Sequence, residues 1–418
     1  MRVVVIGSGI VGAGAAYHLS RRGAAVTVVD GGYPGEATQA GAGIVCPWVD
    51  HPEDDDWYRL TREGARHYPG LVEELGEDIG YAKVGALLVA EDPVDLEPVR
   101  ALLRRRYAGA PEMGEVVDVA TPAELFPPLS DTLSALLVPG AARVDGRSVR
   151  DALLGAAVAR GAEVRTGTAT LTQDGHVLLH PAGHPETSAS TPPPPAPALS
   201  GTTPAGTGSS AAAPAGEASW RQAAPLHPGA TAMPGIQQEP MGEGLPLEAD
   251  AVIVAAGAWT GEVCRPLGVE LPVFPRRGQI LHATLEGVDT AWWPIILPRL
   301  GPYLLGFPDS RVVVGATVED VGFAPRVTVG GLDEVIEAGL RVAPGLASAT
   351  VSETRVGLRP VYAPGSALIG PVTDRVVVAT GLSAYGLTAG PFTGELAAAL
   401  ALGERPPIDL TPYRPPTG

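Results

Sequence analysis

The sequence has few of the residues that cross-link a chain or bind metals through sulfur. Only two cysteines, Cys46 and Cys264, occur among 418 residues, too few for a disulfide scaffold or a thiolate metal site. Lys83 is the only lysine, a compositional bias to which we attach no function. Acidic residues outnumber basic ones 46 to 29, giving a net charge of −17. Because such a surface repels phosphate backbones and anionic lipids, the composition predicts no nucleic-acid partner and no membrane-surface binding.

Long apolar runs are also missing. The N-terminal apolar stretch ends at Gly7, before it reaches the ~7–15 residues of a signal-peptide core. No stretch approaches the ~18 apolar residues of a membrane span. We therefore predict a cytoplasmic protein without a transmembrane segment.

Motifs for several other chemistries are absent as well. Neither a GxSxG elbow nor a GxxxxGK[ST] loop occurs, which excludes the corresponding hydrolases and P-loop proteins. The histidines show no metal-ligand spacing with a third ligand, so no metal site is predicted. The acidic run 53–56 is interpreted as a solvated loop before Trp57.

The first thirty residues follow the order strand, tight turn, helix, strand. The apolar strand 3–6 leads into the turn Gly7-Ser8-Gly9-Ile10-Val11-Gly12 and a small-residue helix, and the next strand ends at Asp30. In such a turn the glycines permit a tight bend, close approach of a pyrophosphate and close packing of the helix on the sheet. Asp30 follows Gly12 by 18 residues, near the ~20 expected of an acid that binds a ribose hydroxyl. The segment predicts a Rossmann-like site for FAD or NAD rather than NADP.

Further strands and helices are expected in the rest of the chain. Apolar strands are expected over 251–255 and 375–379, with a helix over 387–402 after the second. The intervening segments 85–90, 279–285 and 311–316 are typical of a β-rich sheet, and a helix is expected over 332–341. The fold class is therefore α/β, a Rossmann-like dinucleotide-binding domain interleaved with a β-rich (α+β) substrate domain.

The predicted boundaries follow from this alternation. The dinucleotide-binding domain comprises residues 1–48, 135–180, 247–268 and 350–418, and the substrate domain residues 49–134 and 269–349. Between them, residues 181–246 contain 14 prolines and only five charged residues. A stretch of this Pro/Ala/Gly-rich composition cannot bury enough apolar surface to offset its ordering entropy, so we predict a disordered insertion.

The segment after Asp30 favours a flavin. Residues 37–43, Ala-Thr-Gln-Ala-Gly-Ala-Gly, suit backbone that lies against a flat ring. Here the chain resembles the D-amino-acid oxidase/glycine oxidase (DAO) family of FAD-dependent oxidoreductases. Outside the insertion, the resemblance continues in family order through 140–145, 255–259, 275–279, 312–317, 357–360 and 380–394.

The resemblance implies a flavin site assembled from distant segments. A helix N-terminus following 382–388 would place positive potential at the flavin pyrimidine edge. Cys46 does not lie where covalently flavinylated relatives form their link, so the FAD is expected to be non-covalent. The expected cofactor-binding residues are Gly7, Gly9, Ile10, Val11, Gly12, Asp30, Gly31, Ala37, Thr38, Gln39, Gly41, Ala42, Gly43, Ala256, Gly257, Gly381, Leu382, Ser383, Ala384, Tyr385, Gly386, Leu387 and Thr388.

The resemblance also implies the reaction. Such enzymes pass a hydride from the carbon bearing the amine to flavin N5, and the imine then hydrolyses. The partners are a small-molecule amine or amino acid and an acceptor, either O₂ or an electron carrier. Arginine holds a substrate carboxylate better than lysine because it donates two parallel hydrogen bonds. Arg359 in Gly357-Leu358-Arg359-Pro360 is the matching arginine, the alternative being a structural ion pair.

For the other candidate residues of the substrate site, a structural role is an alternative to a role in substrate binding. Tyr303 and Val318 are 15 residues apart, the spacing of two site-lining residues in relatives, although a strand tyrosine is often a packing residue. Tyr385 either offers its hydroxyl to the substrate or covers the flavin. Arg277 lies near the flavin or on the surface.

Two differences from the family's sequence pattern widen the predicted range of substrates. The final turn, Leu382 to Gly386, lacks the second arginine that some relatives carry, and the turn after Pro360 is also changed. Cyclic and N-alkylated amino acids therefore join simple amino acids as candidate substrates. An NAD-dependent dehydrogenase and a non-catalytic dinucleotide-binding scaffold remain as alternatives.

Overall fold

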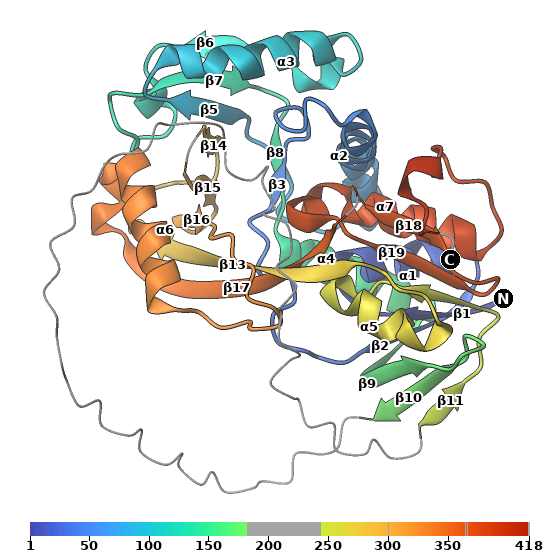
Figure 1. The fold of residues 1–418 in the computed structure, drawn as a ribbon. Coiled ribbons are helices and arrows are strands. Elements are labelled where there is room, and N and C mark those ends of the chain that lie inside the picture. Colours follow the sequence, from blue (N-terminus) through green and yellow to red (C-terminus); the bar gives the residue numbers. More distant parts are fainter. Residues whose placement is uncertain (182–243, 300, 364, 366, 417–418) are drawn as a thin grey trace, which may run out of the picture.

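The chain forms two eight-stranded sheets that it enters alternately (Figure 1). The computed structural model describes residues 1–181, 244–299, 301–363, 365 and 367–416. Most of the predicted insertion, 182–243, lies outside these residues.

The first sheet has a parallel centre, in which β9, β2, β1, β12 and β19 pair in that order. Its strands, in spatial order, are β11 (Leu245–Leu247), β10 (Val177–Pro181), β9 (Glu163–Leu171), β2 (Ala25–Asp30), β1 (Arg2–Ile6), β12 (Ala251–Val254), β19 (Val376–Thr380) and β18 (Leu368–Pro371). Strands β1, β12 and β19 are almost wholly apolar because both of their faces are covered.

The second sheet is antiparallel except where β14 runs parallel to β5. Its strands, in spatial order, are β17 (Thr350–Tyr362), β13 (Val273–Thr284), β16 (Arg311–Gly315), β15 (Tyr303–Phe307), β14 (Ile295–Pro298), β5 (Ala86–Ala90), β7 (Ser134–Val138) and β6 (Val117–Val119). A three-stranded sheet adds β3 (Ile44–Val45), β8 (Ala142–Arg143) and β4 (Ala82–Lys83).

Helices cover both sheets. The seven α-helices of the described residues are α1 (Ile10–Arg21), α2 (Asp55–Leu75), α3 (Glu97–Tyr107), α4 (Gly146–Val158), α5 (Thr260–Cys264), α6 (Val329–Val342) and α7 (Gly386–Ala401). Helix α1 packs against α4 and α7, and glycines let the α1 and α7 backbones approach closely. A Cβ at Gly394 would lie 2.5 Å from the Ala15 nitrogen. No helix in the described part of the chain is long and apolar enough to cross a bilayer.

The fold class predicted from the sequence is confirmed, and the strands and helices it expected are present with shifts of a few residues at their ends. Helix α2 was missed: Asp54 caps it by accepting a hydrogen bond from the Trp57 nitrogen at 2.8 Å, and Asp55 and Asp56 form its first turn. The interpretation of 53–56 as only a solvated loop is therefore wrong.

Some predicted boundaries also differ from the observed strands. Strands β7 and β17 fall in segments assigned to the dinucleotide-binding domain, but both belong to the second sheet. At the edges of the predicted insertion, Pro181 ends β10 and 245–246 lie in β11, which pairs with β10. An apolar strand pattern indicates burial but does not tell which sheet the strand joins.

Candidate cofactor and substrate site

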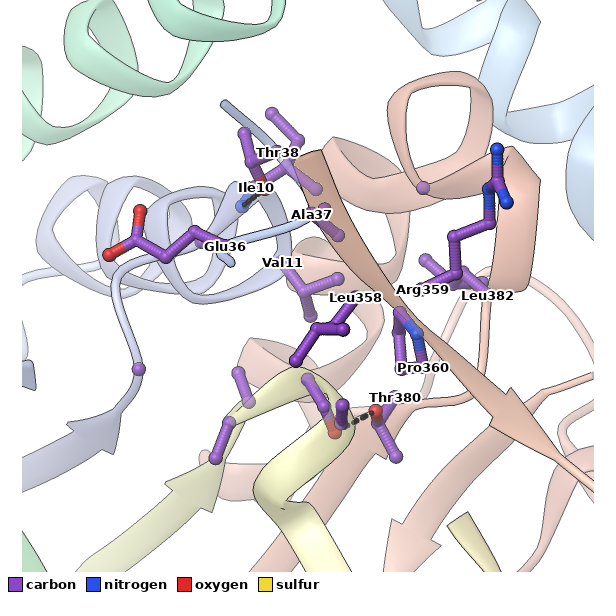
Figure 2. Close-up of a pocket in the computed structure, with 18 of the residues that line it drawn as sticks. Ile10, Val11, Glu36, Ala37, Thr38, Leu358, Arg359, Pro360, Thr380 and Leu382 are labelled. Atoms are coloured by element: carbon purple, nitrogen blue, oxygen red, sulfur yellow. Dashed lines mark hydrogen bonds between the residues drawn. The ribbon is translucent and has the colours of Figure 1, made fainter. Parts of the chain in front are cut away.

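A cavity of about 770 Å³ runs from the carboxyl ends of β1 and β2 to the second sheet. Ligands of open α/β sheets bind outside these strand ends. Figure 2 shows the middle of the cavity, where Arg359 and Pro360 on β17 lie near Leu382. The cavity is thus shared by the dinucleotide-binding segments and the β-rich sheet.

The first turn of α1 is built to accept an anion. Gly9 is its N-cap and provides no side-chain capping bond. The Ile10 nitrogen donates to the Thr38 hydroxyl at 2.9 Å, so the loop 37–43 is fastened to this turn (Figure 2). The uncapped N–H groups and the helix dipole favour a phosphate group here.

Asp30 holds the same turn from the end of β2. Its carboxylate accepts the N–H groups of Ser8 and Gly32, each at 2.7 Å. An ionised carboxylate has about four acceptor positions, so two remain for ribose hydroxyls beside the cavity that Asp30 lines. The residues present therefore fit a dinucleotide.

Almost all of the predicted cofactor-binding residues line this cavity. The exceptions are Gly12, Gln39 and Gly381. Gly12 packs on the turn, since a Cβ there would lie 1.8 Å from the Gly7 oxygen. The Gln39 amide donates to Glu36 at 2.7 Å, and Gly381 has a φ of 82° beside Tyr362. These three shape or support the site without lining it.

The N-terminus of α7 reaches the cavity beside α1, since a Cβ at Gly390 would lie 2.6 Å from the Ile10 side chain. Gly386, Leu387 and Thr388 line the cavity, and the cap residue Tyr385 forms no capping bond. The Tyr385 hydroxyl donates to the Asp50 carboxylate. Burial, together with the adjacent Asp50 charge, raises the pKa of Tyr385 well above its ordinary value, so the phenol stays protonated.

Arg359 and Tyr303 lie together on the cavity wall formed by the second sheet. Arg359 Nη1 donates to the carbonyl of Thr317 at 3.0 Å and to that of Arg277 at 3.4 Å. Burial raises the pKa of Tyr303, and the nearby Arg359 guanidinium opposes that shift. Two carbonyls therefore fix one nitrogen of Arg359, and the Tyr303 hydroxyl is a further hydrogen-bond partner of its guanidinium.

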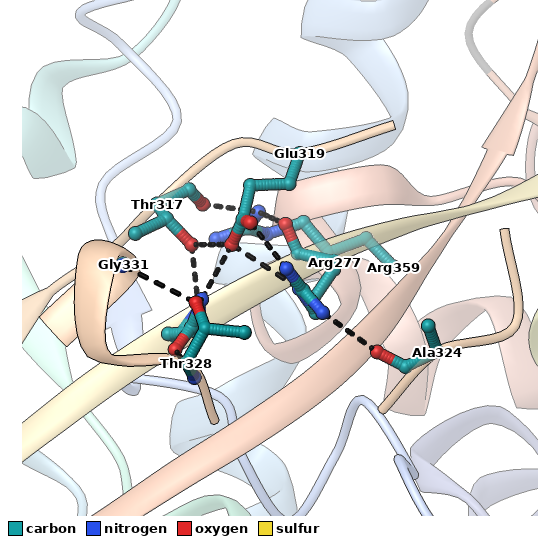
Figure 3. Close-up of polar contacts among 8 residues, drawn as sticks. Arg277, Thr317, Glu319, Ala324, Thr328, Gly331 and Arg359 are labelled. Carbon is teal, nitrogen blue, oxygen red and sulfur yellow. Dashed lines mark hydrogen bonds and ion pairs between the residues drawn. The ribbon is translucent and has the colours of Figure 1, made fainter. Parts of the chain in front are cut away.

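The other arginine, Arg277, is not on the surface and does not line the cavity. It is only 4 % exposed and forms an ion pair with Glu319 (Figure 3). Glu319 also accepts from Gln279 and from the Thr317 hydroxyl, each at 2.7 Å. The carbonyl of Thr317 binds Arg359, so this cluster supports the arginine from behind. The hydrogen bonds from Arg277 and these neighbours lower the pKa of Glu319 to about 2.

Glu319→Gln is expected to destabilise the protein by about 2 kcal/mol at pH 7, because the partly buried Arg277 charge loses its partner. The folded pKa of Glu319 is about 2, below its ordinary value of 4.5. The contribution of the carboxylate is therefore complete above pH 4.5 and is lost as the pH falls toward 2. Urea unfolding of both proteins between pH 7 and pH 3 measures this. A stability difference that stays constant over that range would contradict the assignment.

Val318 does not line the cavity and is 59 % exposed. Its spacing from Tyr303 matched a pattern in relatives, but the side chain lies outside the site.

Several cavity-lining residues were missed. Tyr33 and Trp259 stack with ring centroids 5.7 Å apart near the Asp30 end. Asp50 lines the other end and follows the Ala-Gly loop closely in sequence, the only local signal that could have indicated it.

One group of three potential metal ligands comes together in the described part of the chain: His18, His67 and Glu395, from α1, α2 and α7. Glu395 already accepts from Arg22 at 3.1 Å. Burial lowers the pKa of His18 to about 2, so that imidazole is neutral. We assign no metal to this helix contact.

The parallel sheet with its anion-accepting turn and the second sheet with its cavity-lining arginine define a two-domain dinucleotide-dependent oxidoreductase. The chain belongs to the FAD dependent oxidoreductase (DAO) family, whose model matches residues 2–188 and 231–400. The cofactor is FAD, as the sequence predicted, and the enzyme belongs to a group of amine and amino-acid oxidoreductases. The alternatives of an NAD-dependent dehydrogenase and a non-catalytic scaffold are thereby excluded.

Similar proteins cover the whole chain. It is 38 % identical to the uncharacterized oxidoreductase YurR of Bacillus subtilis (strain 168), over 99 % of this chain and 98 % of that protein. The crystal structure of iminodiacetate oxidase (IdaA) from Chelativorans sp. BNC1 is 40 % identical, covers 99 % of both chains and has a TM-score of 0.82. Glycine oxidase from Geobacillus kaustophilus shares the fold at 22 % identity, with a TM-score of 0.76 over 100 % of this chain and 99 % of that one.

Proposed function

We propose that the protein oxidises the C–N bond of an amino acid or N-substituted amino acid, using non-covalently bound FAD. Bound FAD would accept a hydride at N5 from the carbon that bears the amine, and the resulting imine would hydrolyse in water. The observation that carries the proposal is the position of Arg359, which lines the cavity. A guanidinium has five N–H donors, and the bonds to Arg277, Thr317 and Tyr303 leave some of them for a carboxylate.

The chain's own residues have separate roles in this proposal. Arg359 binds the substrate carboxylate, and Tyr303 contacts the bound substrate beside it. The turn at Gly9 and the acid Asp30 hold the pyrophosphate and a ribose. Bound FAD supplies the hydride acceptor, and the N-terminus of α7 favours the negative charge that the ring gains.

Cys46 does not supply a covalent link in this proposal. It lines the cavity, but its side chain is buried, and burial raises the pKa of the thiol well above its ordinary value. The thiol is therefore a poor nucleophile. Denaturation with acid is expected to release all of the flavin from the protein.

The substrate class is tested by following the flavin absorption anaerobically. The panel contains glycine, sarcosine, D-amino acids, proline and iminodiacetate, the last because of the similarity to iminodiacetate oxidase. Bleaching by one class would support the proposal, and repeating turnover with O₂ or an artificial dye would identify the acceptor type. A flavin band that none of these amines bleaches would contradict it.

A further inference from the structure

Asp50 is an acidic residue that lines the cavity and binds Tyr385. Tyr385, its hydrogen-bond donor, belongs to the turn that begins at Leu382, and the Tyr385 nitrogen donates to the Leu382 oxygen at 2.8 Å. Leu382 in turn forms a β-bridge with Val361, two residues after Arg359. Asp50 and Arg359 are therefore connected through one short segment, and both line the cavity.

The loop that carries Asp50 is held rigidly from outside the cavity. Arg106, only 6 % exposed on α3, donates to the backbone oxygens of Trp48 and Asp50 at 2.8 and 2.7 Å. It also donates to the His51 oxygen at 2.7 Å, and its guanidinium stacks on Tyr58 at 3.9 Å. These bonds use the backbone carbonyl of Asp50 and leave its carboxylate to Tyr385.

The Asp50 carboxylate retains binding capacity. Its Oδ2 accepts from Tyr385, whereas no hydrogen bond to Oδ1 occurs within the described ranges. Tyr385 is itself fixed, since it packs edge-on against Trp57 with ring centroids 5.3 Å apart. A preorganised acceptor of this kind binds an N–H donor without having to reorganise.

The charges that line the cavity are distributed unevenly. Arg359 is its only lining cation among the described residues, and the lining acids are Asp30, Glu36, Asp50 and Glu262. Asp30 lies at the dinucleotide turn, Glu262 lies on α5 beside the Trp259 stack, and Glu36 is bonded to Gln39. Asp50 is therefore the lining acid that binds Tyr385, on the segment that bridges to β17 beside Arg359.

We propose that Asp50, held by Arg106 and Tyr385, accepts a hydrogen bond from the substrate's amino group, so that the site selects amino acids whose carboxylate binds Arg359 and whose N–H binds Asp50. This inference rests on the proposed function and names the substrate feature that its site recognises. Asp50 is a specificity-determining residue, and no covalent step is assigned to it.

The test uses pairs of molecules that differ only at the amine. Sarcosine and methoxyacetate form one pair, and iminodiacetate and diglycolate another, since an ether oxygen replaces the amine in the second member of each. Binding to the FAD-loaded enzyme is measured anaerobically from the flavin absorption. For the amines, the rate of flavin reduction is followed until it saturates with substrate concentration. For the ethers, which do not reduce the flavin, the shift of the flavin spectrum is titrated. Asp50→Asn is expected to weaken the amine members about tenfold or more and to leave the ethers unchanged or tighter.

Two further variants distinguish recognition of the substrate amine by Asp50 from a general effect of the substitution on the enzyme. Glu53→Gln removes a charge from the exposed side of the same loop and is expected to change neither member of a pair. Tyr385→Phe leaves the Asp50 charge in place and is expected to weaken the amines less than Asp50→Asn does. An Asp50→Asn enzyme that loses amines and ethers equally, or loses neither, would overturn the inference. If no amine reduces the wild-type flavin, the proposed function is wrong. If amines reduce the flavin but Asp50→Asn does not change the preference for amines over ethers, only the role of Asp50 is wrong.

Discussion

Replacing Arg359 with leucine is expected to lower kcat/KM for the amino-acid substrate about 100-fold or more, mainly through KM. Two charge-assisted hydrogen bonds to a carboxylate account for about 3 kcal/mol, and leucine provides neither. The flavin content should be unchanged, because Nη1 of Arg359 bonds to backbone carbonyls of the second sheet rather than to the dinucleotide turn. Steady-state kinetics together with the flavin-to-protein absorbance ratio measure both quantities.

Arg359→Lys is the matched control for this substitution. Lysine keeps the charge but donates from a single point, so kcat/KM should fall between those of the wild-type and leucine enzymes. An amine without a carboxylate should react equally poorly with all three. An unchanged KM in the leucine variant would show that Arg359 is a structural arginine bonded to Thr317.

Valine at Gly9 is expected to abolish FAD binding while leaving the fold intact, whereas valine at Gly12 is expected to prevent folding. Gly9 lines the cavity, and a Cβ there would meet only the Thr38 hydroxyl at 3.4 Å. The added side chain would occupy the position of the pyrophosphate and should weaken FAD binding about 100-fold or more. At Gly12 a Cβ would lie 1.8 Å from the Gly7 oxygen, a backbone clash that should cost more than about 4 kcal/mol.

The two glycine variants are compared by soluble yield, circular dichroism and bound flavin. The expected result is a colourless, folded Gly9→Val protein and little or no soluble Gly12→Val protein. A yellow Gly9→Val protein with wild-type flavin content would place the pyrophosphate elsewhere. A folded Gly12→Val protein would show that α1 can move away from the sheet.

Local patterns were sufficient for the dinucleotide turn and for the class of fold. The spacing from Gly7 to Asp30 falls within one strand–helix–strand unit, in which neighbours in sequence are also neighbours in space. The loop 37–43 follows directly, and its Thr38 hydroxyl binds the Ile10 nitrogen as part of the same site. These residues could therefore be assigned before any long-range contact was known.

Local sequence patterns did not predict the contacts between residues far apart in the chain. Arg277 has no local signal for a buried ion pair, because Glu319 lies 42 residues away. Residues 350–362 were assigned to the dinucleotide-binding domain, although they form β17 of the second sheet, because a strand's own sequence does not specify its partner strand. Asp50 and Tyr385 are 335 residues apart, and nothing in the sequence around either residue indicates that the two form a hydrogen bond.

The sequence by itself determined the α/β class, the FAD turn and the resemblance to the DAO family, since each depends on short spacings and on the order of motifs. Only the tertiary structure decided which strands share a sheet, which acid Tyr385 binds and which arginine is buried against a carboxylate. The physical reason is that these features depend on packing between segments far apart in the chain, where burial and charge pairing rather than local periodicity select the partner.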